Sequence, residues 1–412
     1  MSTNAASSGH RWRTFEALGN REFRWLWLAL LVSAVGTWMQ VVTLSLLVLR
    51  ITKGSTLALG SVSLTQALAF VLFSFVGGSV ADRFDKRKLL LVTQSLLGLG
   101  SLALGLLAVT NHASLWSILC LAFFSSAVLS FDQPTRSALV PLLVPEELLT
   151  NAVALQSVAF SAAAAVGPAL AGFLSGPLGL GGIFLLDAAS FAGMLIVLWR
   201  IRLSGRAAAR DQDRSFLESL KEVFQVIRQD PALPWLISGY AAVLFFGPSV
   251  SLILPIFAQR VLHLNNAGLG WLFTAVGLGT ILGGLTVASL REMKRRGLIF
   301  LLAAAVWVGA LVWLGLSHTL LMALGALFVF GVALNTVQSI SIALMQGRVE
   351  ERLRGRIMSV NTLLMMGLRP LGDFPAGALA GAMGPGGVVL LGAGIVAAFM
   401  AFLGTRKGLR EV

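Results

Sequence analysis

Long runs of apolar residues, separated by short polar segments, make up most of this chain of 412 residues. An α-helix needs ~20 consecutive apolar residues to cross the hydrocarbon core of a membrane, and the runs have about this length. The pattern therefore predicts an all-helical membrane protein. Because the first run is longer than the roughly 7–15 residues of a signal-peptide core, we expect it to remain as an uncleaved span. The twelve predicted spans are residues 25–49, 57–81, 89–109, 114–137, 149–174, 182–200, 235–259, 267–290, 298–316, 319–345, 357–382 and 386–404.

The composition excludes an ordinary soluble protein. Hydrophobic residues make up 57% of the chain and charged residues only 12%, and the mean hydropathy is +0.85. Soluble domains carry about 25% charged residues. A net charge of +13 would indicate nucleic-acid binding in a soluble protein. Here the cations follow the loops between spans, so we expect a lipid bilayer and no nucleic acid as a partner.

The distribution of the 31 Lys and Arg residues predicts the orientation in the membrane. Most of them fall in the N-terminal segment, in alternate loops and in the C-terminal segment. The loops in between hold only Arg50, Lys53 and Arg260, and Arg369 lies inside a predicted span. Because loops rich in Lys and Arg stay in the cytoplasm, we expect both termini there. We expect a multi-pass protein of a bacterial-type cytoplasmic, or inner, membrane.

One long polar segment, residues 201–234, divides the chain into two parts. We expect an N-terminal six-helix half at residues 1–200 and a C-terminal six-helix half at residues 235–412. Within the segment, Ser215 and Glu218 form a predicted capping box and Asp230 ends the helix that follows. Its apolar residues share one face, so we expect an amphipathic helix along the inner membrane surface that connects the halves. A docking site for a partner protein is the alternative.

The two halves repeat short sequence features about 205 residues apart, roughly half the chain. This spacing indicates duplication of a six-span unit. The matching positions are Gly77-Gly78 and Gly283-Gly284, Gln133 and Gln338, Ala138-Leu139 and Ala343-Leu344, Glu146-Glu147 and Glu350-Glu351, Gly167 and Gly372, and Ala171-Gly172 and Ala376-Gly377.

A charged turn joins the second and third predicted spans. Residues 77–88 read Gly-Gly-Ser-Val-Ala-Asp-Arg-Phe-Asp-Lys-Arg-Lys. Gly77 and Gly78 allow another helix backbone to approach where the second span leaves the membrane. Asp82 follows Gly78 by one helical turn on the same face. The cations of the turn place it on the cytoplasmic side, and a basic loop that only obeys this topology rule is the simpler interpretation.

The spacing of this turn resembles the signature loop of the major facilitator superfamily, Gly-x-Leu/Val-Ala-Asp-Arg-x-Gly-Arg-Arg/Lys-x-Arg/Lys. Asp85 departs from the pattern, because most members have glycine there. The Asp-Arg-Phe-Asp variant is similar to the branch that holds siderophore exporters, such as enterobactin exporters, and macrolide efflux pumps. The matching residues are Gly78, Val80, Ala81, Asp82, Arg83, Lys86, Arg87 and Lys88.

Other segments resemble the same branch. They lie at residues 20–24, 33–38, 131–136 and 187–191, and in the C-terminal half mainly at 354–359. The resemblance implies two parallel six-helix repeats with the substrate site between them near the membrane midplane. Residues 167–172 also resemble part of an antiporter motif, although Ala163 and Ala171 replace two of its glycines. Close packing of helices at small residues is the alternative.

The resemblance also implies a gate on the cytoplasmic side. We expect Asp82 to lie near Gly355 at the start of the eleventh span, where the helix dipole stabilises a carboxylate. Arg136 is its expected ionic partner. The second copy of the loop lacks the Asp-Arg pair, so we expect a gate latch on this side only. The candidate gating residues are Gly78, Asp82, Arg83, Arg87, Arg136 and Gly355.

Charged residues inside spans are costly in lipid and indicate function. Arg369 and Asp373 share one face of the eleventh span, and Asp132 lies near the cytoplasmic third of the fourth. We expect Asp373 to exchange a proton as Arg369 moves, with Asp132 as the second candidate. A buried structural ion pair is the alternative for Arg369 and Asp373, and a structural hydrogen bond for Asp132. We expect Asp187 in the sixth span to be structural.

Uncharged polar residues inside the spans are candidates for a substrate cavity. They are Gln40, Gln66, Asn335 and Gln338, to which Trp38 adds an aromatic surface suited to a lipophilic substrate. The alternative is that the polar groups join helices to one another and that Trp38 packs or faces lipid.

Enzyme and metal motifs are missing from the sequence. There is no phosphate-binding loop, metalloprotease motif or nucleophile elbow, and we expect no enzyme activity and no cofactor. The single Cys120 and the four unpaired histidines predict neither a disulfide nor a metal site. We expect a monomeric secondary transporter that exports a hydrophobic or amphipathic compound, such as a drug or a siderophore-like metabolite, in exchange for protons. The alternatives are a proton-coupled uptake symporter, a membrane receptor or scaffold and, last, a membrane enzyme.

Overall fold

The computed structural model describes residues 13–201, 216–289 and 295–410, and within these ranges the chain is helical and contains no β-strand. Eleven helices of the described part are long and apolar enough to span a membrane. Helices suit lipid because they satisfy every backbone polar group within one segment. The prediction of an all-helical membrane protein is confirmed.

The N-terminal part of the chain supplies six spanning helices, and polar side chains fix where several of them begin. Asn20 accepts hydrogen bonds from two backbone N–H groups at the start of the first, and Ser55 and Ser114 cap the second and the fourth. The helices are α1 (Arg21–Ile51), α2 (Thr56–Arg83), α3 (Lys86–Val109), α4 (Leu115–Leu139), α5 (Leu149–Leu174) and α6 (Gly179–Arg200). The short helices η1 (Arg13–Gly19), η2 (Val140–Leu142) and η3 (Glu146–Leu148) flank them.

The C-terminal part contains more interruptions than the apolar pattern predicts. The span predicted at residues 235–259 is divided at Gly247 and Pro248, where proline supplies no N–H for a continuous helix. The elements are α8 (Leu233–Phe246), α9 (Val250–Arg260), α10 (Asn266–Ser289), α11 (Arg296–Gly315), α12 (Leu320–Gly347), α13 (Glu351–Leu363), the π-helical turn η4 (Leu364–Leu368), α14 (Arg369–Gly404) and α15 (Lys407–Arg410).

The last apolar helix crosses the bundle twice. Gly384 interrupts α14 with a positive φ of 76°, a conformation that favours glycine. On either side of it, Gly372 packs against the Phe245 carbonyl and Gly392 packs against the Phe246 carbonyl. Both segments therefore pass the same end of α8, and the chain reverses direction at Gly384. The eleven apolar helices thus provide twelve crossings.

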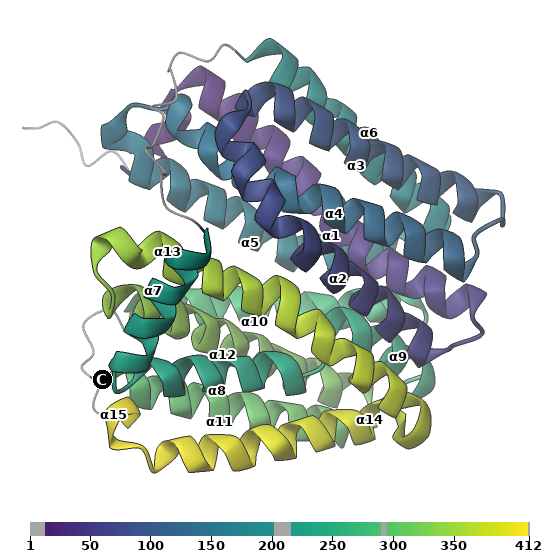
Figure 1. Ribbon diagram of the computed structural model, residues 1–412. Coiled ribbons are helices and arrows are strands. Elements are labelled where there is room, and N and C mark those ends of the chain that lie inside the picture. The colour runs from purple at the N-terminus through teal and green to yellow at the C-terminus, as the bar shows by residue number, and fades with distance from the viewer. Residues whose placement is uncertain (1–12, 202–215, 290–294, 411–412) are drawn as a thin grey trace, which may run out of the picture.

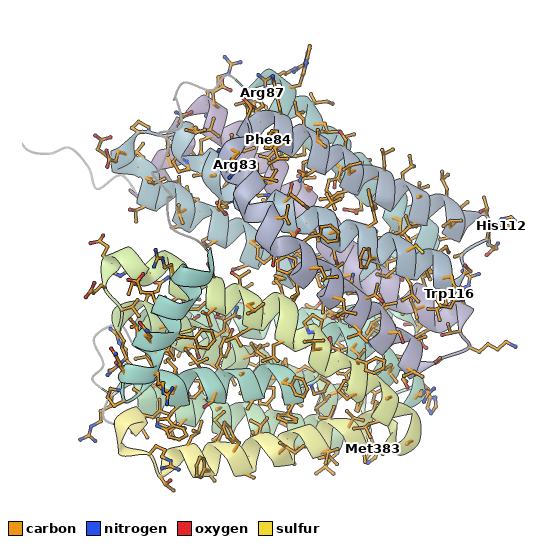
Figure 2. All side chains as sticks on the ribbon, in the orientation of Figure 1. Arg83, Phe84, Arg87, His112, Trp116 and Met383 are labelled. Carbon is orange, nitrogen blue, oxygen red and sulfur yellow. The ribbon has the colours of Figure 1, made fainter. Side chains whose placement is uncertain are left out.

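The bundle has two ends, which we call the termini side and the far side. The termini side holds the start of α1, the end of α14 and the turn between α2 and α3, and the far side holds the turns at residues 52–55, 110–114 and 261–265 (Figure 1). Figure 2 shows Arg83, Phe84 and Arg87 on the termini side, with His112 and Trp116 at the opposite end.

The helices form two groups that are visible in Figure 1. In the first, α1 packs on α5 and α6, α2 on α4, and α3 on α4 and α6. In the second, α12 packs on α10 and α11, and α14 packs on α8 and α11. The repeated pattern agrees with a duplicated six-span unit.

Contacts between the two groups lie on the far side and near the middle of the bundle. α2 packs on α14 and α5 packs on α10. Gly172 of α5 lies directly against the backbone of Gly270 in α10. Arg260 of α9 donates a hydrogen bond of 2.7 Å to the Gly54 carbonyl in the turn before α2. Gly367 in η4 contacts Val71 in α2 near the middle of the bundle. In this state the two groups therefore contact each other from the far side to the middle of the bundle.

The connecting helix α7 (Phe216–Gln229) is attached to the second group. Glu222 pairs with Arg356 of α13, and the Arg348 Nε atom lies 2.8 Å from the Asp230 Oδ2 atom. Burial opposes ionisation of Asp230, but hydrogen bonds from the Leu233 and Ala232 N–H groups and from Arg348 outweigh it and hold the pKa of Asp230 below its usual value. The predicted end of the helix at Asp230 is confirmed, whereas Ser215 lies outside the described residues.

Candidate functional site

Asp373 lies in α14 at the contact between the two groups of helices. Its side chain is buried, and its Oδ1 atom accepts a hydrogen bond of 2.9 Å from the Ser249 N–H group. The Ser63 hydroxyl of α2 faces the same carboxyl. The backbone of Asp373 packs on Gly60, which belongs to the other group. One carboxyl therefore contacts elements of both groups.

The break between α8 and α9 explains how a backbone N–H group reaches this carboxyl. Ser249 is the N-cap of α9, so its N–H group has no partner within that helix. A helix N-terminus also carries a partial positive charge that stabilises a carboxylate. Gly372 allows α14 to approach the Phe245 carbonyl at the end of α8, which brings Asp373 to this position.

Arg369 lies one turn before Asp373, about 6 Å nearer the termini side at 1.5 Å per residue. Its guanidinium is half-buried and acts electrostatically on Asp373 and on Tyr240 of α8. Within the described part of the chain, no ion pair joins Arg369 to Asp373. In this state the Asp373 carboxyl is therefore stabilised by the hydrogen bond from Ser249 and not by an ion pair with Arg369.

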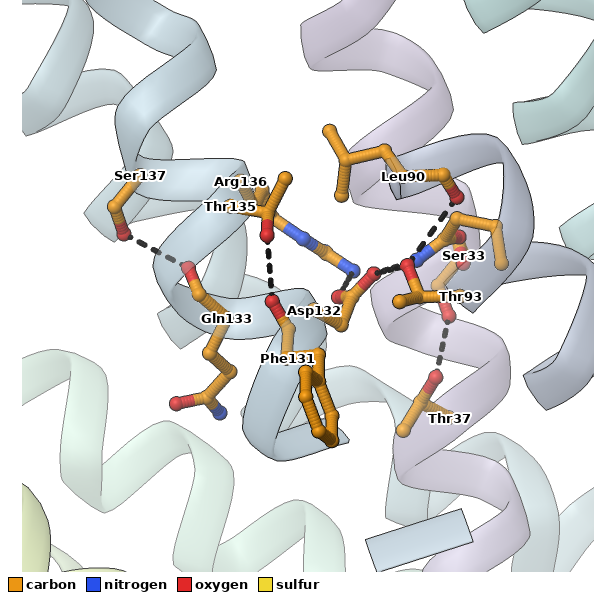
Figure 3. A network of polar contacts seen from close by, with 11 residues as sticks. Ser33, Thr37, Leu90, Thr93, Phe131, Asp132, Gln133, Thr135, Arg136 and Ser137 are labelled. Atoms are coloured by element: carbon orange, nitrogen blue, oxygen red, sulfur yellow. Dashed lines mark hydrogen bonds and ion pairs between the residues drawn. The ribbon is translucent and has the colours of Figure 1, made fainter. Parts of the chain in front are cut away.

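Asp132 lies in a buried polar cluster between α3 and α4 (Figure 3). The Arg136 Nη2 atom lies 2.5 Å from its Oδ2 atom, and the Gln94 Nε2 atom donates a hydrogen bond of 2.7 Å to its Oδ1 atom. The Thr93 hydroxyl donates a second bond of 2.8 Å to Oδ1. The carboxylate is thus neutralised by one cation and satisfied by two further donors from the neighbouring helix.

The Asp187 carboxyl joins α6 to α3 and is also buried. The Ser101 hydroxyl donates a hydrogen bond of 2.7 Å to its Oδ2 atom, and Oδ1 packs against Gly36 of α1. Among the described residues, Oδ1 has no hydrogen-bond partner. The sequence did not identify the partners Ser101, Gln94 and Thr93, because polar residues spaced along different spans carry no signal of which helices are neighbours.

The signature turn is shorter than its sequence pattern, because α2 continues to Arg83 and α3 begins at Lys86. Asp85, which departs from the family pattern, caps α3 by accepting a hydrogen bond of 2.8 Å from the Lys88 N–H group. Arg83 is exposed, and the Arg87 guanidinium donates to the carbonyls of Leu198, at 2.7 Å, and Trp199 at the end of α6.

Among the described side chains, no hydrogen bond or ion pair joins one candidate gating residue to another. Gly78 in α2 and Gly355 in α13 have open space where a Cβ atom would lie. Arg136 pairs with Asp132 of its own helix. Asp82 lies in the last turn of α2, but its side chain is outside the described residues, so its contact with Arg136 or α13 stays a prediction.

The candidate cavity residues divide into two kinds. Gln40, Gln66 and Gln338 are half-buried, and no hydrogen bond ties them to other described residues. Asn335, by contrast, donates a hydrogen bond of 2.7 Å to the Thr280 carbonyl and so joins α12 to α10. Trp38 packs edge-on against Phe160, with ring centroids 5.9 Å apart. The three glutamines stay predicted cavity residues, whereas Asn335 and Trp38 contribute to packing between helices.

The arrangement fits binding and transfer better than bond chemistry. Within the described residues, no group of three His, Cys, Asp or Glu side chains is placed to hold a metal ion. A buried carboxyl beside an arginine, at the boundary of two helix groups, has the elements needed to take up and release a proton.

Comparison with known proteins identifies the family. The family model described as "transmembrane secretion effector" matches residues 13–412, almost the whole chain. The chain belongs to this family of major facilitator superfamily transporters. The family membership confirms the resemblance found in the signature turn. It also confirms the prediction that the chain is not an enzyme, because the family consists of transporters.

Two relatives of the chain are named as efflux proteins. The chain is 28% identical over 367 residues to the enterobactin exporter EntS of Citrobacter koseri, an alignment covering 88% of this chain and 85% of the relative. It is 24% identical over 331 residues to the macrolide efflux protein A of Streptococcus pyogenes, covering 77% of this chain and 80% of the relative.

Solved structures support the fold. The nucleoside transporter NupG matches with a TM-score of 0.73 at 13% identity, covering 94% of this chain and 99% of that one. A bacterial homologue of the iron transporter ferroportin, in an inward-facing state, matches with a TM-score of 0.71 at 19% identity, covering 94% and 99%. The chain is therefore a multi-pass membrane transporter with the major facilitator fold.

The Asp132 cluster predicts a loss of stability when its carboxylate is removed. Asp132→Ala leaves the Arg136 guanidinium and the Gln94 amide without their acceptor, so we expect the free energy of unfolding to fall by about 3 kcal/mol. The measurement is denaturant unfolding in detergent. The double variant Asp132→Leu with Arg136→Met removes both charges and should recover most of the loss. An Asp132→Ala protein as stable as the wild type would contradict a structural role for the cluster.

Proposed function

We propose that this transporter exports a hydrophobic or amphipathic small molecule, a drug or a siderophore-like compound, in exchange for protons. The relatives that support the proposal are a macrolide efflux protein and an enterobactin exporter. The observation that supports proton coupling is the buried Asp373 carboxyl at the contact of the two helix groups, with Arg369 one turn away.

We propose that residues 1–200 and 235–412 act as two bodies that rock about the connecting segment 201–234. The contacts between α2 and α14 and between α5 and α10 close the far side in this state, and on the termini side Gly78 and Gly355 have open space where a Cβ atom would lie. With the termini in the cytoplasm, this is an inward-facing state. A substrate would then enter from the cytoplasm and leave after the termini side has closed.

The coupling step requires that Asp373 bind a proton in one state and release it in another. Burial in a low-dielectric span favours the neutral acid, whereas a nearby guanidinium favours the carboxylate. Movement of Arg369 relative to Asp373 during rocking would change which effect prevails. Asp132 is the second candidate, although its pairing with Arg136 and Gln94 favours a structural role.

A substrate-accumulation screen tests the export of such compounds. We expect cells that produce the protein to accumulate less of a transported drug or siderophore than cells that lack it, and an uncoupler that dissipates the proton gradient should abolish the difference. Higher accumulation in producing cells would show uptake and contradict export. An unchanged difference in the presence of the uncoupler would contradict proton coupling.

Variants of the coupling pair locate the proton site. Asp373→Asn cannot ionise, so we expect it to lose gradient-driven efflux while substrate binding stays measurable, and we expect Asp132→Asn to cause only a partial loss. Exchange of the pair (Arg369→Asp with Asp373→Arg) would restore folding only if the two residues formed a structural ion pair. Because Asp373 instead accepts from Ser249 at the N-terminus of α9, we expect the exchange to lower stability and abolish transport. Full gradient-driven efflux by Asp373→Asn would remove this residue from the mechanism.

Reporter fusions test the proposed orientation. The charge distribution predicts that reporters at either terminus and within residues 205–213, which lie outside the described residues, read cytoplasmic. Reporters within residues 110–113 and 317–319 should read external. An external reading at residues 205–213 would contradict both the orientation and the inward-facing assignment.

A latch at the termini side follows from the proposed rocking. We propose that closure brings Asp82 to the N-terminus of α13 near Gly355, where the helix dipole stabilises its charge. Asp82→Asn removes that charge, so we expect slower turnover with unchanged expression, and a larger fraction of inward-facing protein. Because Asp85 is also a carboxylate of this turn but caps α3, Asp85→Asn is the matched control and should retain turnover. Wild-type turnover by Asp82→Asn would contradict the latch.

A further inference from the structure

The eleventh span contains a π-helical turn that the proposed coupling does not yet explain. η4 (Leu364–Leu368) lies between α13 and α14, immediately before Arg369. π-helical turns are rare and are frequent at functional sites. The turn marks the point where the neighbours of the span change, because α14 packs on α2 of the other group whereas α13 packs on α7 and α12 of its own.

One side chain from α8 holds this turn. The Tyr240 side chain is fully buried, and its hydroxyl lies 3.0 Å from the Sδ atom of Met365 in η4. A thioether sulfur is a weak acceptor, so the contact is easily exchanged for a better one. The Arg369 guanidinium lies within electrostatic range of both the Tyr240 hydroxyl and the Asp373 carboxyl.

The geometry of a π-helical turn links these groups. If η4 became α-helical, the register between α13 and α14 would change by one residue, which is about 100° of rotation around the helix. Such a change would move Arg369 and Asp373 relative to α13, the helix that carries Gly355 and is tied to the connector through Arg356. A contact that fixes η4 therefore fixes the coupling pair relative to the termini side.

We propose that Tyr240 is a positioning residue for proton coupling: its hydroxyl on Met365 holds the π-helical turn, and the turn sets where Arg369 lies relative to Asp373. Tyr240 acts through these residues and does not itself bind the proton. This inference rests on the proposed proton coupling at Asp373. According to this inference, a change in the protonation of Asp373 is transmitted to α13 through the π-helical turn.

Fluorine NMR tests the link directly, because Tyr240 is the only tyrosine in the chain. Full-length protein labelled with 3-fluorotyrosine in lipid nanodiscs should give a signal from this residue alone. Asp373→Asn mimics the protonated carboxyl and should shift the signal. In a Met365→Leu background the contact is lost, and the same Asp373→Asn change should leave the signal where it is. An unshifted signal in Asp373→Asn, or a shift that persists with Met365→Leu, overturns the proposal.

Transport supplies the second readout. We expect Tyr240→Phe to lower gradient-driven efflux about fivefold, or ~1 kcal/mol, while substrate binding is retained. Met365→Leu should cause the same loss, and the double variant should be no worse than either, because both changes remove one contact. Ser341→Ala is the matched control, since it removes another buried hydroxyl from the same group, bonded at 2.7 Å to the Val337 carbonyl. Additive losses in the double variant overturn the proposal.

The two proposals fail in different ways. Full gradient-driven efflux by Asp373→Asn would remove the proposed coupling site, whatever the NMR signal does. The fluorine experiment needs no transport, so an unshifted signal removes the role of Tyr240 even if Asp373 proves essential for coupling.

Discussion

Direct contact between helix backbones at glycine residues holds the two groups of helices together. Gly172 lies against Gly270, and Gly377 lies against Gly60, with no side chain between the helices. In lipid, helices do not associate through the hydrophobic effect, and close packing of small residues has to supply much of the attraction. These contacts lie on the far side, while Gly78 and Gly355 on the termini side face open space. This distribution of close contacts supports the proposed alternation of access between the two sides.

Three buried carboxyl groups in the spans are stabilised in three different ways. Asp132 pairs with an arginine, Asp187 accepts a hydrogen bond from Ser101, and Asp373 accepts one from the backbone N–H group of Ser249. Only the last depends on elements that contact both groups. An ion pair inside one group keeps its partner during rocking, whereas a carboxyl at the boundary meets a changing environment. This difference in surroundings makes Asp373 the first candidate for proton coupling and Asp132 the second.

The sequence predicted the features that depend on local pattern. Apolar run lengths identified the spans, and the turn that contains Asp82 identified the superfamily. Features that depend on contacts between distant segments were not predictable. The sequence left open whether Asn335 lines a cavity or joins helices, and the structure shows that it joins α12 to α10. Similarly, the sequence did not show that Gln94 of a different helix donates to Asp132. Gly367 and Pro370 indicate a weakened helix at the π-helical turn, but they do not identify it as π-helical.

Two of the helix interruptions in the second group, the break between α8 and α9 and the π-helical turn η4, lie next to the candidate coupling site. A helix break inside a membrane leaves backbone polar groups that must be satisfied within the protein, since lipid provides no partner. At the break between α8 and α9, the Asp373 carboxyl provides that partner for Ser249. The same carboxyl is therefore an N-terminal acceptor for α9, which contacts α1 and α2 on the far side. Protonation of Asp373 would remove the negative charge that the N-terminus of α9 stabilises. The proposed proton site would thus act on the far side through α9 and on the termini side through η4, and one carboxyl would connect the two surfaces that the proposed mechanism opens in turn.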